Sequence, residues 1–147
     1  MATGFNWAGD AILRDTVMWD KRAVIGTSGV YIPTDIRAWL SSTNSEVIHR
    51  ALQEIDLPQT REPGTFDLRA WKIWDFAAKS VQYITDKKSF GLEDIWLFPE
   101  ETLVLHKGDC EDSSFLLATL LLASGISEHC VRVVLGQVST PDGAYGH

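Results

Sequence analysis

Residues 107–125 read Lys-Gly-Asp-Cys-Glu-Asp-Ser-Ser-Phe-Leu-Leu-Ala-Thr-Leu-Leu-Leu-Ala-Ser-Gly, and this stretch decides how the chain folds. Gly108 allows a tight turn, and Asp109 is suited to cap a helix that begins at or beside Cys110. The glycine at the end of the stretch is suited to stop that helix in the left-handed conformation. All but one of residues 115–123 are apolar. A helix without a polar face is expected to be buried on all sides.

A cysteine at the first turn of a buried helix has two interpretations. Free N–H groups and the positive end of the helix dipole lower the pKa of a thiol, and the thiolate is the nucleophile of cysteine chemistry. A small buried cysteine is also common in protein cores, where it is inert. The position of Cys110 alone leaves both open. With only two cysteines in the chain, a disulfide framework is not expected.

Length, composition and charge place the chain among ordinary globular domains. It has 147 residues, of which 45% are hydrophobic and 22% charged, so one domain with a single core is expected. The net charge of -7 argues against nucleic acid and anionic membranes as partners. The sequence has neither a signal-peptide pattern nor an apolar run of membrane-spanning length. Localisation stays open: cytoplasmic by default, periplasmic or secreted if a leader has been removed.

Carboxylates gather around the cysteine. Between residues 93 and 112 only Lys107 is basic, whereas seven residues are acidic: Glu93, Asp94, Glu100, Glu101, Asp109, Glu111 and Asp112. Negative charges beside a thiolate raise its pKa and oppose the helix dipole. Helix capping explains some of these acids. A bound hard cation would relieve the others, because Ca²⁺ prefers clustered carboxylate oxygens.

The rest of the sequence predicts short elements on both sides of this stretch. Helices are expected over residues 10–19, 34–40, 43–57 and 67–85. A hairpin is expected from residues 23–25 and 30–32, and a strand from the β-branched run 130–138, followed by a turn at 139–143. Residues 86–88 predict a polar break. Residues 91–103 predict an irregular lead-in to the cysteine, because Pro99 excludes a continuous helix.

The loop at residues 59–64 is the expected boundary between two parts of the chain. Residues 1–64 are then a mostly helical N-terminal extension, and residues 65–147 are the core that carries the cysteine. The fold class expected from this order of elements is α+β.

Several of these residues together resemble a known family. The resemblance rests on four features: the Asp94-x-Trp96-x-x-Pro99 segment, the Gly108-to-Asp112 run, the expected strand at 131–138 and the final His147. In this combination the chain resembles the transglutaminase-like superfamily, and within it most closely the bacterial transglutaminase-like cysteine proteinases. The resemblance covers about half the chain, from near residue 67 onward. It implies a papain-like core in which the helix that begins at the cysteine packs against an antiparallel sheet.

The resemblance also implies roles for individual residues. Cys110 corresponds to the nucleophile and His147 to the general base. The backbone N–H of Cys110 is expected to stabilise the oxyanion, with Trp96 as a candidate for the second donor. Some of the similar bacterial proteinases depend on calcium held by acids that flank the nucleophile, and Asp109 and Glu111 occupy those positions here.

The implied activity is thiol-dependent acyl transfer, most directly the hydrolysis of a peptide or amide bond in a protein substrate. Protein crosslinking or deamidation at glutamine is an alternative within the same chemistry. A non-catalytic transglutaminase-like module for binding or assembly is an alternative of another class. The chemistry itself requires no cofactor, and the Ca²⁺ considered above is an optional addition. The sequence does not separate hydrolysis from transfer and does not identify the substrate.

The family pattern continues beyond this sequence. An Asp or Asn that orients the histidine is expected shortly after His147, where the printed sequence ends. We therefore expect a further segment or a second chain to complete the sheet, and little turnover without it. A zinc site is a remaining alternative. Its candidate ligands would be His106, Cys110, His129 and Cys130, but their spacing fits no common zinc pattern.

Overall fold

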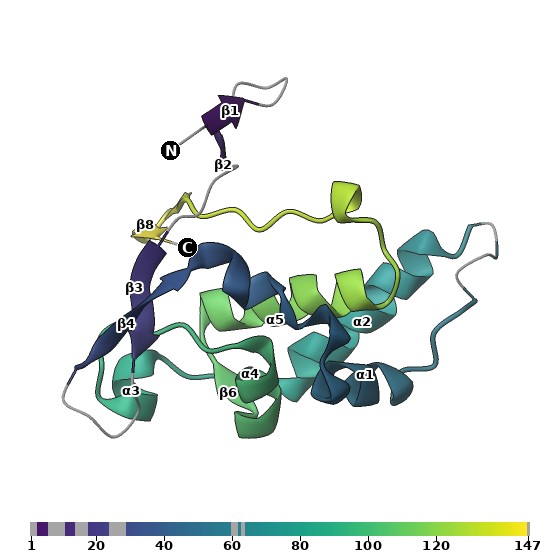
Figure 1. The fold of residues 1–147 in the computed structure, drawn as a ribbon, viewed down its shortest axis with the longest axis horizontal. Coiled ribbons are helices and arrows are strands. Elements are labelled where there is room, and N and C mark those ends of the chain that lie inside the picture. The colour runs from purple at the N-terminus through teal and green to yellow at the C-terminus, as the bar shows by residue number, and fades with distance from the viewer. Residues whose placement is uncertain are drawn as a thin grey trace.

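Helices and small sheets alternate along the chain, which confirms the α+β class (Figure 1). The computed structural model describes residues 3–5, 11–13, 18–23, 29–59, 62 and 64–146. Within these residues no helix is both long and apolar enough to cross a membrane.

The central element is helix α5, which runs from Cys110 to Ala123 as expected (Figure 1). It packs against α1 (Glu46–Gln53), α2 (Phe66–Ser80) and α4 (Pro99–Leu105). Their shared core consists of buried apolar residues: Ile48, Ala51, Ile73, Ala77, Leu103, Leu116 and Leu120. Gly125 follows the helix at φ 93°, in the left-handed region that favours glycine. The surroundings of α5 explain why its sequence has no polar face.

An aromatic cluster covers another side of α5. Trp39 of the 3₁₀ helix η1 (Ile36–Leu40) is fully buried between Trp96 and Phe115. The ring centroids of Trp39 and Trp96 are 5.1 Å apart in an edge-on arrangement, and the Trp39 indole donates a hydrogen bond to the Trp96 carbonyl at 3.1 Å. Each such ring pair contributes about 0.5–1.5 kcal/mol beyond its buried area. The cluster therefore fixes the lead-in segment against the first turns of α5.

The strands of the described residues form two-stranded sheets. These are β1 (Thr3–Phe5) with β2 (Ala11–Leu13), β3 (Met18–Ala23) with β4 (Tyr31–Asp35), β5 (Gln82–Tyr83) with β6 (Lys107–Gly108), and β7 (Gln137–Thr140) with β8 (Gly143–Gly146). Only the β5–β6 pair is parallel. The pairing of Ala23 with Tyr31 confirms the expected hairpin, and β7–β8 confirms the expected turn.

Three helix predictions need correction. The helix expected over residues 10–19 is wrong for the described residues of that range, because residues 11–13 form β2 and residues 18–19 begin β3. The helix expected over 67–85 ends at Ser80, because residues 82–84 bond instead to residues 106–108. The polar break at 86–88 belongs to a short helix, α3 (Asp86–Phe90). For the end of α2, a pairing with a distant part of the chain decides the local structure.

Two other boundaries follow local rules more closely. The helix expected from Thr43 begins as the 3₁₀ helix η2 (Ser42–Asn44), and α1 starts at Glu46 with Ser45 as its N-cap. Pro99 is the first residue of α4, a position where its fixed φ suits a helix start.

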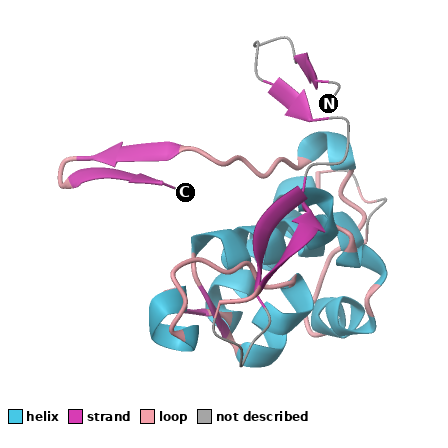
Figure 2. Ribbon diagram, turned by 60° about the vertical axis from the view of Figure 1, so that its left-hand side comes forward, coloured by secondary structure: helices cyan, strands magenta, loops and turns pink. Residues whose placement is uncertain are grey.

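The strand expected over residues 130–138 is also shorter than predicted. Residues 128–130 form the 3₁₀ helix η3 (Glu128–Cys130), residues 131–136 have no regular structure, and β7 begins only at Gln137. Val134 in this stretch is 78% exposed. Figure 2 shows the β7–β8 hairpin projecting away from the helices. Packing of α5 against an antiparallel sheet, and with it the papain-like arrangement, therefore stays a prediction.

Residues before and after residue 64 share contacts in the described parts of the chain. Ile48 of α1 belongs to the core around α5. The backbone N–H of Trp96 donates to the Lys21 carbonyl at 2.7 Å, and both terminal nitrogens of Arg22 lie 2.5 Å from the Glu101 carboxylate. The division into an N-terminal extension and a core at residue 64 stays a prediction.

Candidate active site at the start of helix α5

The turn that leads into α5 is built around Gly108 and Asp112. Asp112 is fully buried, and its Oδ1 accepts a hydrogen bond from the Leu97 N–H at 2.8 Å. A Cβ atom on Gly108 would lie only 2.7 Å from the Cβ of Asp112. Glycine is thus required at residue 108, and Asp112 ties the lead-in segment to the first turn of the helix. Both residues help to place the residue between them, Cys110.

Cys110 is the first residue of α5 and is half-buried. Its thiol donates a hydrogen bond to the Glu111 carboxylate, with 3.2 Å between Sγ and Oε2. Cys130 is exposed and lies in η3, beyond the other end of α5. Both cysteines are free. Of the two cysteines, only Cys110 lies at the start of α5.

The electrostatic setting of Cys110 differs from the sequence expectation. Burial, the hydrogen bond to Glu111 and the charges of Glu111 and Asp109 together raise the pKa of its thiol to about 11. In the protein without a bound cation, the pKa of this thiol is therefore raised, whereas the helix end alone would lower it. Burial and the two neighbouring acids outweigh the helix end.

Three carboxylates converge beside this thiol. Asp86, Asp109 and Glu111 place oxygen atoms within 4.8 Å of one another. Asp86 is 2% exposed, and its Oδ2 accepts a hydrogen bond from the Ile95 N–H at 2.6 Å. Asp109 occupies the N-cap position, as expected, but its side chain makes no capping hydrogen bond, and its Oδ1 is buried without a hydrogen-bond partner among the described residues.

The proximity of these acids disfavours their charged forms. Burial, followed by the charges of Asp109 and Asp94, raises the pKa of Asp86 to about 6. Burial also raises the pKa of Glu111, and its hydrogen bond with Asp109 acts in the same direction. Clustered, partly desolvated carboxylate oxygens are the ligands that Ca²⁺ prefers. Their chemistry and spacing fit a hard divalent cation.

Asp86 was missed by sequence reasoning, which identified only Asp109 and Glu111. It precedes Lys87 and Lys88, and such a run is typical of a solvated surface. The parallel pairing of β5 with β6 brings this segment to the cysteine turn, because Tyr83 pairs with Gly108. No local pattern in the sequence signals that pairing.

Tyr83 is the second residue that the sequence did not indicate. Its pKa is raised by burial and then by the charges of Cys110, Asp109 and Glu111. Its backbone pairs with Gly108, two residues before Cys110. The side chain nevertheless remains 63% exposed, so it lies at the surface beside the nucleophile.

The roles predicted for Trp96 and His147 are not tested by the described residues. Trp96 is buried in the aromatic cluster, where its ring packs on Phe115 at 5.1 Å, and its role as an oxyanion donor stays a prediction. His147 lies outside the described residues. Within the described residues the groups that could hold a metal are Asp86, Asp109 and Glu111, and the zinc alternative through His106 and His129 finds no support there.

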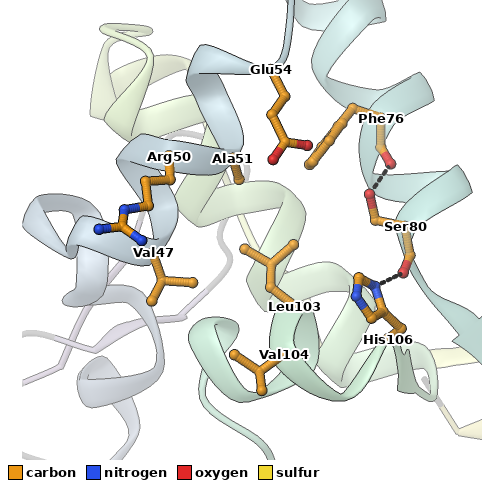
Figure 3. Close-up of a pocket in the computed structure, with 9 residues that line it drawn as sticks. All are labelled: Val47, Arg50, Ala51, Glu54, Phe76, Ser80, Leu103, Val104 and His106. Carbon is orange, nitrogen blue, oxygen red and sulfur yellow. Dashed lines mark hydrogen bonds between the residues drawn. The ribbon is translucent and has the colours of Figure 1, made fainter.

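Two hollows lie on the described surface of the helical body. One, of about 350 Å³, lies between α1, α2 and the end of α4 (Figure 3), and it is lined by Val47, Arg50, Ala51, Glu54, Phe76, Ser80, Leu103, Val104 and His106. His106 is held at its edge by a 3.1 Å hydrogen bond between Nδ1 and the Ser80 carbonyl. The other, of about 200 Å³, is a groove between α2 and α5 that reaches Tyr83 and Ser113. Only this second groove includes residues next to the Cys110 turn.

Comparison with known proteins gives one match. The family model described as a transglutaminase-like domain matches residues 61–142, a range that includes Cys110 and the three clustered acids. No curated protein and no solved structure matches the chain significantly.

Proposed function

Because the chain belongs to the transglutaminase-like domain family, we propose that it catalyses thiol-dependent acyl transfer with Cys110 as the nucleophile. The finer proposal is hydrolysis of a peptide or amide bond in a protein substrate, as in the bacterial transglutaminase-like cysteine proteinases that the sequence resembles. The observation that carries it is the position of Cys110: the first residue of a buried helix, half-exposed, with an open groove beside it.

The reaction requires a base, an oxyanion donor and an acceptor. The base takes the proton from Sγ, and the thiolate forms an S–C bond to the substrate carbonyl carbon. The first N–H groups of a helix have no partner within it, so the backbone N–H of Cys110 is available to the oxyanion. The protonated base returns its proton to the leaving amine, and the thioester remains. Water then attacks the thioester, which releases the acid and restores the thiol. By resemblance, the base is His147.

We also propose that Asp86, Asp109 and Glu111 hold a calcium ion. The support is the 4.8 Å spacing of their oxygens, the burial of Asp86, and the buried Asp109 Oδ1 without a hydrogen-bond partner in the described structure. When bound, a divalent cation supplies positive charge beside Cys110 and so offsets the two acids that oppose thiolate formation. The three side chains themselves orient the turn that carries the nucleophile.

A direct experiment separates the alternatives within this chemistry. A casein-type protein reports hydrolysis, and a glutamine substrate with an added amine reports crosslinking, because an amine instead of water then resolves the thioester. We expect hydrolysis to exceed amine transfer, and Cys110→Ala to abolish both. Amine incorporation without cleavage would instead assign the chain to crosslinking. The His147→Ala variant is expected to lose activity as well.

A non-catalytic binding or assembly module is the second candidate. The observation in its favour is the pKa of Cys110 near 11, which leaves very little thiolate near neutral pH without a cation. This candidate predicts that calcium leaves the reactivity of Cys110 unchanged. The catalytic proposal predicts that calcium increases it.

A further inference from the structure

The groove between α2 and α5 has an apolar interior without charge. It is lined by Trp74, Ala77, Ala78, Val81, Tyr83, Ser113 and Leu117. The two alanines leave room on the α2 side, and the larger side chains form the walls. The volume is about 200 Å³. A cavity of roughly 150 Å³ lined by apolar groups is large enough to bind benzene, so the groove is large enough for one aromatic or branched aliphatic side chain.

The groove lies along the helix that begins at the nucleophile, although Cys110 itself does not line it. Cys110, Ser113 and Leu117 recur at helical spacing, so they lie on the same face of α5. Along the helix axis Ser113 is about 4.5 Å, and Leu117 about 10 Å, from Cys110. An extended peptide advances about 3.3 Å per residue. A peptide whose carbonyl lies at Cys110 therefore places its second or third residue from that carbonyl over the groove.

Exposed aromatic residues mark the same place. Trp74 is 53% exposed and Tyr83 is 63% exposed, and both line the groove. Tyr83 also pairs with Gly108, two residues before Cys110. Aromatic rings that remain accessible at a cleft are typical of surfaces that bind a ligand. Trp71 is similarly exposed at 57% on the same helix but does not line the groove, which makes it a matched comparison.

We propose that this groove is a substrate subsite that accepts one large apolar side chain, aromatic or branched aliphatic, of a peptide whose carbonyl is attacked by Cys110. The inference rests on the proposed function and adds a substrate class to it. Because the lining carries no charge, an acidic side chain at the same place would lose its hydration without compensation.

The test uses peptidyl vinyl sulfones, which alkylate a cysteine without completing a catalytic cycle. The thiolate forms an S–C bond to the vinyl carbon that is attached to the peptide, and a solvent proton adds to the vinyl carbon beside the sulfone. Three tripeptide probes carry Phe, Ala or Glu at the second residue from the reactive carbon, and a second set varies the third residue. Intact-mass spectrometry gives the alkylation rate, with and without calcium, and each rate is divided by the iodoacetamide rate of the same protein under the same condition.

We expect the Phe probe to react about 10- to 200-fold faster than the Ala probe at one of the two positions. The Glu probe is expected to be the slowest. Trp74→Ala, which removes a wall, and Ala78→Trp, which fills the groove, should both reduce the Phe preference to less than about threefold. Trp71→Ala should leave it unchanged. The iodoacetamide rate of Cys110 and the melting temperature identify any variant that has lost its fold. The two groove variants perturb the structure in opposite ways, because one removes a side chain from the groove and the other adds one.

The outcomes distinguish a failure of the subsite proposal from a failure of the proposed function. Reaction of Cys110 with iodoacetamide but equal rates for the three probes would overturn the subsite and leave the nucleophile in place. Equal effects of Trp71→Ala and Trp74→Ala would also overturn it. Failure of iodoacetamide to label Cys110, even with calcium, would overturn the proposed function and the subsite together.

Discussion

Replacement of Gly108 by alanine tests the construction of the cysteine turn. The added Cβ would lie 2.7 Å from the Cβ of Asp112 and 2.9 Å from its Oδ2, closer than side chains approach in folded proteins. Asp112 has little freedom to move away, because it is fully buried and its Oδ1 holds the Leu97 N–H. The substitution therefore has to displace either the turn or the helix.

The expected magnitude follows from these two contacts. Overpacking of a well-packed site costs about 1–3 kcal/mol. If Asp112 shifts to relieve the clash, the buried Leu97 N–H loses its acceptor, which costs about 1–3 kcal/mol more. We expect a loss of roughly 2–6 kcal/mol in the free energy of unfolding. For a domain of this size the melting temperature would fall by roughly 6–19 °C.

Urea denaturation followed by tryptophan fluorescence measures this loss, since the chain has six tryptophans. Gly136→Ala is the matched control, because nothing lies within 4 Å of the position its Cβ would take. We expect this control to stay within about 0.5 kcal/mol of the parent. A Gly108→Ala protein that is equally unperturbed would refute the close approach of Asp112 to residue 108.

Three further predictions concern the acids and the thiols. Calcium should raise the melting temperature, because a ligand that binds only the folded state stabilises it. The double variant Asp109→Asn with Glu111→Gln should remove that shift, whereas the control Glu128→Gln should keep it. A melting temperature of the parent that does not depend on calcium would contradict the site. The cation-free protein should be less stable at pH 8 than at pH 5 by roughly 2–4 kcal/mol. Folding raises the pKa of Asp86 to about 6 and that of Asp112 to about 7. The folded protein therefore binds protons more tightly than the unfolded chain, and this stabilisation, complete below the unfolded value of 3.8, is lost as pH rises through the folded values. Greater stability at pH 8 would contradict this sign. Without calcium at pH 8, iodoacetamide should label exposed Cys130 faster than Cys110, whose pKa near 11 leaves it protonated, and calcium should reverse the order; an order that calcium does not change would favour the binding module.

The elements that sequence reasoning identified correctly are determined by short-range features. The start of α5 at Cys110 follows from the turn at Gly108 and the N-cap position of Asp109, all within three residues. Its burial follows from the absence of a polar face. The β3–β4 hairpin likewise joins segments that are close in the sequence.

The elements that it missed depend on distant partners. Residues 82–83 leave the helical pattern of α2 because they pair with residues 107–108. That same pairing brings Asp86 and Tyr83 to Cys110, so half of the candidate site is invisible in the local sequence. Residues 131–136 have high β propensity but form no strand, because propensity alone does not supply a paired neighbour. The raised pKa of Cys110 does not follow from the local sequence alone either, because its first cause is burial, which depends on tertiary packing.

Formation of an acyl-enzyme at Cys110 tests the central claim most directly. The protein is mixed with a p-nitrophenyl ester in the presence of calcium, quenched in acid and mapped by mass spectrometry, while the released nitrophenol is followed by absorbance. The proposed function predicts a burst of nitrophenol close to one equivalent and an acyl group on Cys110 but not on Cys130, both abolished by Cys110→Ala. The absence of a burst, or equal acylation of the two cysteines, would contradict the assignment of Cys110 as the nucleophile.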